Sequence, residues 1–231
     1  MGKAAPSAGE AVEAARVARE AGRLRIAQRA LDHALQSLDP RGDPDLAGRA
    51  AEEADLLGRA LLAQGATLAA LGELQRACAL GRDGARPGLA RVAGDYARWR
   101  PRAGPIGAPR DSLVAGASGA FWAGARARGR VVAIEGGITG EGTESFGRIL
   151  ELCARDVQWV FVDMEKLTYV GSAGLAVAVK LAERLRGQGG GLAMFAMSPN
   201  LKLLVETLGL AQFLNPAGTL LDALDLACRA G

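Results

Sequence analysis

The sequence predicts an α/β domain preceded by an all-α domain, and three observations carry this prediction. Apolar and amphipathic segments alternate in residues 119–231, which is typical of a sheet with parallel neighbours and helical cover. Residues 1–100 instead show small apolar residues at helical spacing. A stretch rich in Pro, Gly and Arg, residues 101–118, separates the two patterns and is predicted to be a linker.

Composition indicates a packed protein of a cytosolic type. Of the 231 residues, 49% are hydrophobic but only 4% are aromatic, so the core must consist mainly of Ala, Leu and Val. Cys78, Cys153 and Cys228 have neither a CxxC neighbour nor a His neighbour, which predicts buried, reduced thiols. The N-terminus has no apolar signal core and no run of 18 apolar residues occurs. We therefore expect a cytoplasmic protein without stable membrane insertion.

The net charge of +3 is concentrated in one stretch. Residues 82–110 carry 7 basic and 2 acidic side chains, whereas residues 1–81 carry 10 and 11, and residues 111–231 carry 11 and 12. Such a stretch is able to contact nucleic acid or an acidic partner. Tyr96 and Trp99 show no repeated basic-aromatic spacing, however, so we interpret the stretch as a solvated linker and expect no nucleic-acid partner.

Residues 1–100 contain an internal repeat. Four pairs of identical residues are each separated by 43 positions. They are Gly22 and Gly65, Ala27 and Ala70, Leu31 and Leu74, and Ala34 and Ala77. A glycine followed by small residues at helical positions predicts pairs of helices joined by tight turns. The spacing over residues 9–82 resembles tetratricopeptide (TPR) repeats, and the resemblance implies a helical-hairpin domain that binds a protein. A plain helical bundle is the alternative.

The C-terminal segment predicts the order β-β-α-β-α-β-α-(β)-α, in which the first two strands form a hairpin. The expected strands are residues 120–126, 130–137, 157–164 and 192–197, with a short one at 213–216, and the expected helices are residues 143–155, 172–187, 198–209 and 216–230. The continuous apolar run at 157–164 predicts a central strand. Ser198, followed by Pro, is expected to cap its helix.

The segment GSAG places Ser172 between a predicted strand and a predicted helix, which raises the question of nucleophilic catalysis. A serine nucleophile needs a base, yet the one histidine, His33, lies in the other domain, and Lys180 follows eight positions later. The nucleophile elbow G-x-S-x-G is also absent, because Val170 stands two residues before the serine. We therefore expect no enzyme and no catalytic residue. Ser172 is interpreted either as a helix N-cap or as a site for a phosphate, which a helix N-terminus accommodates well.

Cofactor and metal sites are not expected either. The sequence contains no G-K-[ST] phosphate loop. Asp163 and Glu165 come near a strand end without a third ligand at a suitable spacing, and we interpret them as solvating the turn after that strand.

Four segments make residues 112–231 resemble a STAS domain of the anti-sigma-factor-antagonist family. They are VVAIEGGIT (131–139), VQWVFVDMEKLTYVGSAGLAVAV (157–179), GGLAMFAMSPNLKLLVETLGL (190–210) and FLNP (213–216). The resemblance implies a mixed sheet with helices on one side, and an ATP-using protein partner, often a serine kinase that is also an anti-sigma factor. The family's phosphorylated residue falls on Ser172, and the glycine and leucine of its motif fall on Gly174 and Leu175.

One position departs from the family pattern, because Gly171 stands where the family has an aspartate. The docking surface expected from the resemblance comprises Gly171, Ser172, Ala173, Gly174 and Leu175, together with Thr139. One hypothesis is a bacterial-type regulatory adaptor in partner switching, either phosphorylated at Ser172 or docking constitutively, whose helical repeats bind a second protein. The alternative is an accessory subunit that binds the ATPase of an ABC-type lipid transporter.

Overall fold

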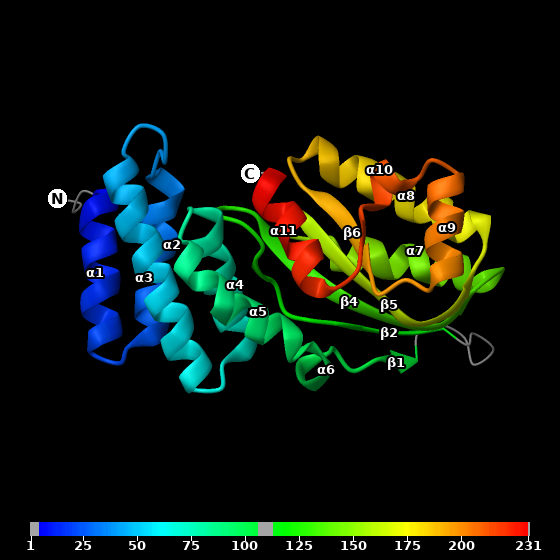
Figure 1. Cartoon of the computed structure of the whole chain (residues 1–231), viewed down its shortest axis with the longest axis horizontal. Coiled ribbons are helices and arrows are strands. Elements are labelled where there is room, and N and C mark those ends of the chain that lie inside the picture. The colour runs from blue at the N-terminus through cyan, green and yellow to red at the C-terminus, as the bar shows by residue number, and fades with distance from the viewer. Residues whose placement is uncertain (1–4, 106–112, 231) are drawn as a thin grey trace. The chain divides into compact units, whose positions relative to one another are not determined.

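The computed structural model describes residues 5–105 and 113–230 and divides the chain into two compact units (Figure 1). The first unit comprises Met1–Ala93 and Trp122–Arg126, and the second comprises Gly94–Phe121 and Ala127–Gly231. The second unit therefore begins before the boundary expected at residue 100, because residues 94–100 pack with the sheet, as described below.

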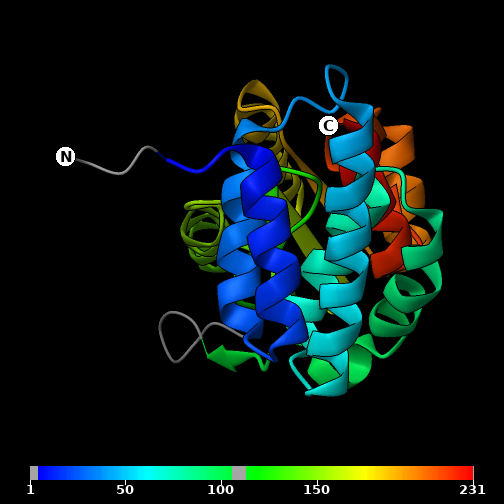
Figure 2. The ribbon, with the colours of Figure 1, turned by 90° about the vertical axis from the view of Figure 1, so that its left-hand side faces the viewer.

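The first unit is helical, as predicted. Its elements are α1 (Ala8–Glu20), α2 (Leu24–Ser37), α3 (Pro44–Ala63), α4 (Thr67–Ala79), the 3-10 turn η1 (Asp83–Ala85) and α5 (Arg86–Gly94). Ser7 and Glu10 form a capping box at the start of α1, and the Asp43 side chain caps α3 by accepting a hydrogen bond from the Leu46 N–H. Helix α1 packs on α2 and α3 packs on α4, with the long helices running side by side (Figure 2).

The repeat of 43 residues appears in the structure as equivalent burial. Gly22 and Gly65 both take the left-handed conformation, with φ values of 72° and 74°, at the turns into α2 and α4. The matching alanine and leucine pairs are all fully buried; they are Ala27 and Ala70, Leu31 and Leu74, and Ala34 and Ala77. Small residues thus let paired helices approach closely. The assignment to a tetratricopeptide-like array stays a prediction.

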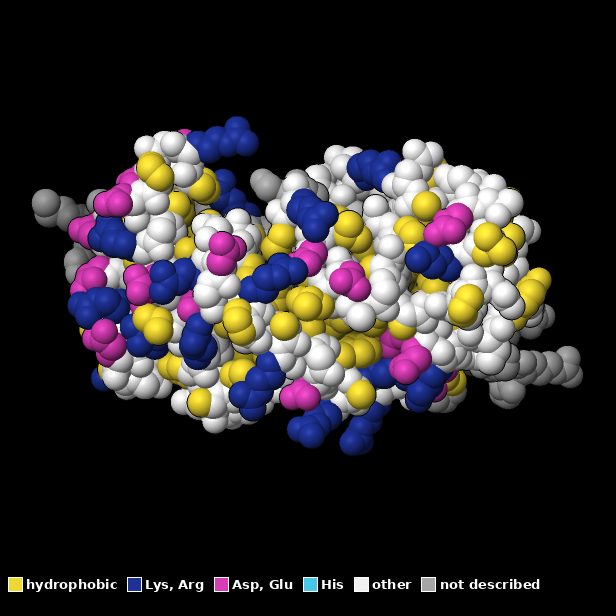
Figure 3. All heavy atoms as spheres, in the orientation of Figure 1, with side chains coloured by type: hydrophobic (Ala, Val, Ile, Leu, Met, Phe, Trp, Pro, Cys, Tyr) yellow, Lys and Arg dark blue, Asp and Glu magenta, His cyan; other side chains and the backbone are white. Residues whose placement is uncertain are grey.

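Charges in the helical unit are found both at its surface and in its core. Basic and acidic side chains are interspersed over the face seen in Figure 3. Inside the unit, Arg76 is 1% exposed and pairs with Glu73 at 3.1 Å and with Asp32 at 2.7 Å. Burial raises the pKa of Glu73 above its usual value, while Arg76 opposes that shift. Sequence periodicity did not reveal this cluster, because charged residues on a helix usually face solvent.

The second unit contains a seven-stranded sheet with the path β1-β2-β4-β5-β6-β7, and β3 pairs with β4 beside that path. The strands are β1 (Gly104–Pro105), β2 (Val114–Ala117), β3 (Phe121–Trp122), β4 (Arg128–Ile138), β5 (Trp159–Val170), β6 (Gly191–Phe195) and β7 (Pro216–Ala217). β4 to β7 are parallel neighbours, and β1 and β2 are antiparallel. The sheet is therefore mixed, with β5 between β4 and β6, as expected.

Two sequence predictions about chain segments need correction. Residues 101–118 are not only a linker, because β1 and β2 lie within them and pair with the sheet edge; residues 106–112 of that stretch lie outside the described residues. The short strand expected at residues 213–216 exists, but it begins only at Pro216. The short helix α10 (Ala211–Leu214) ends before it, and left-handed Asn215 leads directly into β7.

Helices lie on both faces of the sheet, not on one as the family resemblance implied. The other helices of this unit are α6 (Tyr96–Trp99), α7 (Glu141–Cys153), α8 (Ser172–Gly187), α9 (Pro199–Thr207) and α11 (Leu220–Ala230). Leu192 and Met194 of β6 share one hydrophobic core with α7 and α8. Four buried residues of α11 are outside that core although α11 contacts β5 and β6; they are Leu220, Ala223, Leu224 and Ala227. Helix α11 thus covers the opposite face (Figure 1).

The opposite face of the sheet also holds a buried polar network. Asp163 of β5 is fully buried; its Oδ2 accepts a hydrogen bond from Tyr96 at 2.9 Å and pairs with Arg100 Nε at 2.5 Å. Arg100 Nη1 also pairs with Glu135 of β4 at 2.8 Å. Burial, and then the neighbouring Asp163, raise the pKa of Tyr96 well above its usual value. The interpretation of Asp163 as a solvated turn residue is therefore wrong: it lies mid-strand and anchors residues 94–100 on the sheet.

None of Cys78, Cys153 and Cys228, all among the described residues, forms a disulfide. Cys153 is buried, and burial raises the pKa of its thiol. Cys78 and Cys228 are half-buried, so the expectation of burial holds for one of the three.

Candidate docking site at the Ser172 turn

The second half of β5 carries the turn at Ser172 beyond the body of the sheet. β6 pairs with β5 only from Trp159 to Asp163, whereas β4 continues beside β5 as far as Val170. Register shifts in β4 on either side of Glu135 and Gly136 accompany this extension. The two-stranded ribbon ends at the pair Ile138 and Val170, directly before the turn.

The turn itself is fixed by the backbone. Gly171 has an extended conformation, with φ −77° and ψ 164°, and its N–H donates a hydrogen bond to the Ile138 carbonyl at 3.0 Å. Helix α8 begins at Ser172, and the Leu175 N–H donates to the Gly171 carbonyl at 3.2 Å. Gly171 is therefore the N-cap, and the interpretation of Ser172 as the capping serine is wrong, because Ser172 already has a helical conformation. Because Gly171 has no side chain, no side-chain acceptor caps the free backbone N–H groups at the start of α8.

Two predicted positions of the docking surface are buried supports. A Cβ atom added to Gly174 would lie 2.8 Å from Cγ2 of both Ile138 and Val170, so only glycine fits without displacement. Leu175 is 2% exposed and packs in the core with the ribbon end. Ser172 and Ala173 are exposed, and Gly171 is half-buried. The surface available to a partner at the turn is therefore formed by Ser172 and Ala173, while Gly174 and Leu175 hold the turn in place.

Thr139, predicted from the distant segment VVAIEGGIT, lies close to this turn. It follows Ile138, whose carbonyl accepts the Gly171 N–H, and it is exposed. The Thr139 carbonyl accepts a hydrogen bond from the Gly142 N–H at 2.9 Å as the chain turns into α7. The structure thus brings the starts of α7 and α8 together at the end of the ribbon.

Exposed apolar side chains lie near the turn, and they were not predicted from the sequence. Tyr169 is 59% exposed, and three leucines of the α9 region, Leu203, Leu204 and Leu208, are 41–63% exposed. A groove of about 300 Å³ runs along α8 between these elements. It is lined by Ser172, Leu175, Ala176, Val179, Lys180, Glu183, Leu208 and Leu210. The leucine-rich run LKLLVETLGL was a signal for this surface, because it holds more leucines than one buried helix face needs.

The electrostatics of the turn suit a negatively charged group. Ser172 is the first residue of a 16-residue helix, where free backbone N–H groups and the helix dipole favour an anion. Lys180 and Glu183 both line the adjacent groove and offset each other, so the preference for an anion comes from the helix N-terminus. Within residues 5–105 and 113–230, no group of three or more His, Cys, Asp or Glu side chains is placed to hold a metal ion. Across the same residues, none of the helices is both long enough and apolar enough to span a membrane.

The N-cap geometry yields a prediction for the residue that departs from the family pattern. Gly171→Asp is expected to raise the free energy of unfolding by about 0.5–1 kcal/mol, because the carboxylate caps α8 and the unfolded chain loses freedom. A Cβ at this position meets only the Ile138 oxygen at 3.6 Å and the Tyr169 ring at 3.9 Å, which are ordinary contacts. Urea unfolding measures the change, with Gly171→Ala as the control without a cap. A value for the aspartate variant at or below that of the alanine variant would contradict the capping role.

Comparison with known families agrees with this geometry. A family model described as "Mlab, STAS domain" matches residues 123–221, which include the ribbon, the Ser172 turn and helices α7 to α10. No curated protein matches the chain.

Proposed function

Because residues 123–221 form a STAS domain, we propose that the protein is a non-catalytic regulatory adaptor whose STAS module docks a protein partner through the Ser172 turn. The partner we favour is a switch serine kinase that also acts as an anti-sigma factor, or a related ATP-using protein. Phosphorylation of Ser172 would gate the contact. The helical unit binds a second protein, and the adaptor acts in the cytoplasm without cofactor or metal.

One observation carries this proposal. Ser172 is exposed at the first position of α8, within a turn that is held by buried Gly174 and Leu175. A phosphate added there would bring nearly two negative charges without entering the core, and the helix N-terminus would tolerate it. The fold would persist while the potential presented to the partner changed sign, which is how a binding switch operates.

The same site gives little support to catalysis. A serine nucleophile requires a base within hydrogen-bond reach, and the chain's one histidine, His33, belongs to the first unit, on α2. Ser172 instead borders an apolar groove and exposed leucines. Apolar surface beside a polar turn is characteristic of protein interfaces.

A second function has support from Gly171. The family aspartate is missing at the N-cap, where it would be expected to contact the partner kinase. The matching family description names Mlab and not an anti-sigma-factor antagonist. We therefore keep, as the alternative, an accessory subunit that binds the ATPase of an ABC-type lipid transporter through the same surface and without phosphorylation.

The test compares Ser172→Glu with Ser172→Ala in binding to a purified switch kinase encoded near this protein. We expect Ser172→Glu to weaken binding at least about tenfold, equivalent to about 1.4 kcal/mol, and Ser172→Ala to bind like the wild type. Incubation with the kinase and ATP, followed by mass spectrometry, is expected to place the phosphate on Ser172 and to leave the alanine variant unmodified.

Gln188→Glu provides the matched control, because Gln188 is exposed at the opposite end of α8 and gains the same charge. Equal binding by Ser172→Glu and Gln188→Glu would rule out the switch. Binding to a transporter ATPase with no modification of Ser172 would favour the alternative.

A further inference from the structure

The segment Tyr96–Arg100 lies where the two-stranded ribbon leaves the sheet. β6 ends at Phe195, which is paired with Asp163 of β5, and beyond that pair β5 keeps only β4 as a neighbouring strand among the described residues. The Tyr96 ring packs edge-on against the Phe195 ring, with 5.4 Å between their centroids. Arg100 pairs with Asp163 and with Glu135 of β4. This segment therefore contacts all three strands at the base of the ribbon.

β5 contains a bulge at this base. Between its residues Asp163 and Lys166 it advances by three positions, while the residues of β4 paired with them advance by two. The extra residue of a bulge falls out of the regular ladder, and here the Glu165 N–H donates instead to Asp163 Oδ1, at 2.9 Å. The other carboxylate oxygen, Oδ2, holds Tyr96 and Arg100. Asp163 thus ties the bulge to the Tyr96–Arg100 segment.

Arg100 bridges the two strands across the bulge. Its Nε pairs with Asp163 before the bulge, at 2.5 Å, and its Nη1 pairs with Glu135 at 2.8 Å. Glu135 stands opposite Lys166, after the bulge. A guanidinium group has donors in fixed directions and so holds two carboxylates at a set separation, which the point charge of an ammonium does not. The Arg100 side chain is only 10% exposed, so water screens the bridge weakly. The bridge therefore fixes the register from which the ribbon begins.

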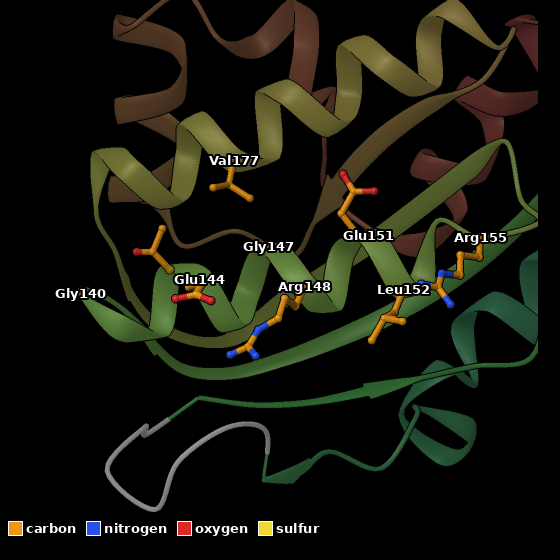
Figure 4. Close-up of a pocket in the computed structure, with 9 residues that line it drawn as sticks. Gly140, Glu144, Gly147, Arg148, Glu151, Leu152, Arg155 and Val177 are labelled. Carbon is orange, nitrogen blue, oxygen red and sulfur yellow. The ribbon is translucent and has the colours of Figure 1, made fainter.

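The far end of the ribbon carries the starts of α7 and α8. Neither β2 nor β6 pairs with the ribbon beyond Glu135 and Asp163 within the described part of the chain. Figure 4 shows the groove between the two helices, with Gly140 where α7 begins and Val177 of α8 pointing toward Gly147. A Cβ added to Gly147 would lie 3.3 Å from Val177 Cγ1, so the helices pack closely. A change of register at the base of the ribbon is therefore transmitted to both helix starts together.

We propose that Arg100 is a positioning residue for the Ser172 turn, which it places by bridging Asp163 and Glu135 at the base of the ribbon. It acts on the turn through the backbone of β4 and β5. Arg100 belongs to the segment that directly follows Ala93, the end of the long N-terminal part of the helical unit. The chain connection from that unit thus helps to determine the docking surface of the STAS domain. The effect of Arg100 on a partner rests on the proposed function, whereas its effect on the ribbon does not.

Amide hydrogen exchange of the full chain, followed by mass spectrometry, tests the effect on the ribbon. Glu135→Gln removes the charge at the ribbon side of the bridge and leaves the pair between Arg100 and Asp163 intact. We expect residues 164–171 to exchange at least about tenfold faster than in the wild type, and residues 191–195 of β6 to exchange unchanged. Arg100→Lys is expected to have the same local effect, because its ammonium group keeps a charge beside Asp163 but cannot span to Glu135.

Two variants serve as matched controls. Glu165→Gln is the same substitution at an exposed carboxylate of the bulge. Lys166→Gln removes the pair between Lys166 and Glu135, at 3.2 Å, in which the lysine side chain is 56% exposed. Both are expected to leave exchange of the ribbon at the wild-type rate, because exposed charges contribute little. Acceleration by Lys166→Gln equal to that of Glu135→Gln would assign the effect to the exposed pair and overturn the role of Arg100.

Binding of the switch kinase is the second measurement. We expect Glu135→Gln and Arg100→Lys to weaken it about tenfold with Ser172 intact. Leu220→Ala, at a buried site on α11, lowers stability and is expected to leave binding unchanged, which separates position from stability. Unchanged exchange of residues 164–171 in both bridge variants would overturn the proposal whatever the partner. Faster exchange with wild-type kinase binding would support the positioning role and count instead against docking at the Ser172 turn.

Discussion

The variant Asp163→Ala is expected to lose about 3–5 kcal/mol of unfolding free energy, as is typical when one partner of a buried ion pair is removed. Asp163 is fully buried in β5, and its carboxylate is the shared acceptor for Tyr96 and Arg100. Its other oxygen accepts the Glu165 N–H at 2.9 Å. Removal therefore leaves the buried Tyr96 hydroxyl without this acceptor and leaves Arg100 with Glu135 as its remaining carboxylate partner among the described residues.

The measurement is urea unfolding followed by circular dichroism, with Glu165→Ala as the matched control. Glu165 lies two residues farther along the same strand, and it is exposed. We expect its replacement to change stability by less than about 0.5 kcal/mol. A loss for Asp163→Ala no larger than that of the control would show that the network does not stabilise the domain.

A double-mutant cycle separates the pair from its surroundings. Arg100→Met alone leaves the Asp163 carboxylate buried without its cation, so it is expected to be strongly destabilising as well. The variant with both changes is expected to lose less than the sum of the two single losses. Residues 94–105 should become sensitive to proteases in each single variant, because the Asp163 network holds this segment to the sheet.

The sequence predicted those features that local patterns determine. The helix that starts at Ser172 and ends near Gly187, the cap at Ser198 and the left-handed Gly209 all follow from short-range preferences, and the structure has them. The central position of β5 followed from its apolar run, since a strand with two covered faces needs apolar residues on both.

Features that depend on distant contacts could not be predicted in this way. Asp163 looked like a turn residue because its partners, Tyr96 and Arg100, stand more than 60 positions earlier in the chain. The strands β1 and β2 were hidden within a Pro- and Gly-rich stretch, because two to four residues at a sheet edge carry no readable alternation.

The turn at Ser172 illustrates both cases. The sequence pattern predicted its place at the strand–helix junction. The identity of the N-cap residue could not be predicted, because it depends on the backbone angles of Gly171, which has no side chain to indicate them. The apolar surface beside Ser172 was missed for a different reason. The sequence does not show which leucines of residues 201–210 face solvent, and only the packing of α9 and the turn after it exposes Leu203, Leu204 and Leu208.

Gly174→Ala is expected to destabilise the protein by about 2 kcal/mol, within the usual range of overpacking in a filled core. The new methyl would meet Cγ2 of Ile138 and of Val170 at 2.8 Å each. Both neighbours are buried and β-branched, so their side chains cannot rotate away without strain. The first turn of α8 must therefore shift relative to the end of the β4–β5 ribbon.

The same substitution at Gly187, the last residue of α8, is the control. Nothing lies within 4 Å of a Cβ there, so Gly187→Ala is expected to gain up to about 1 kcal/mol from helix propensity. Opposite signs for two identical substitutions in one helix would locate the effect in the contact with Ile138 and Val170. Because the shift also moves Ser172, partner binding should weaken in Gly174→Ala although the hydroxyl is intact. Unchanged partner binding in Gly174→Ala would mean that binding does not depend on the position of the Ser172 turn.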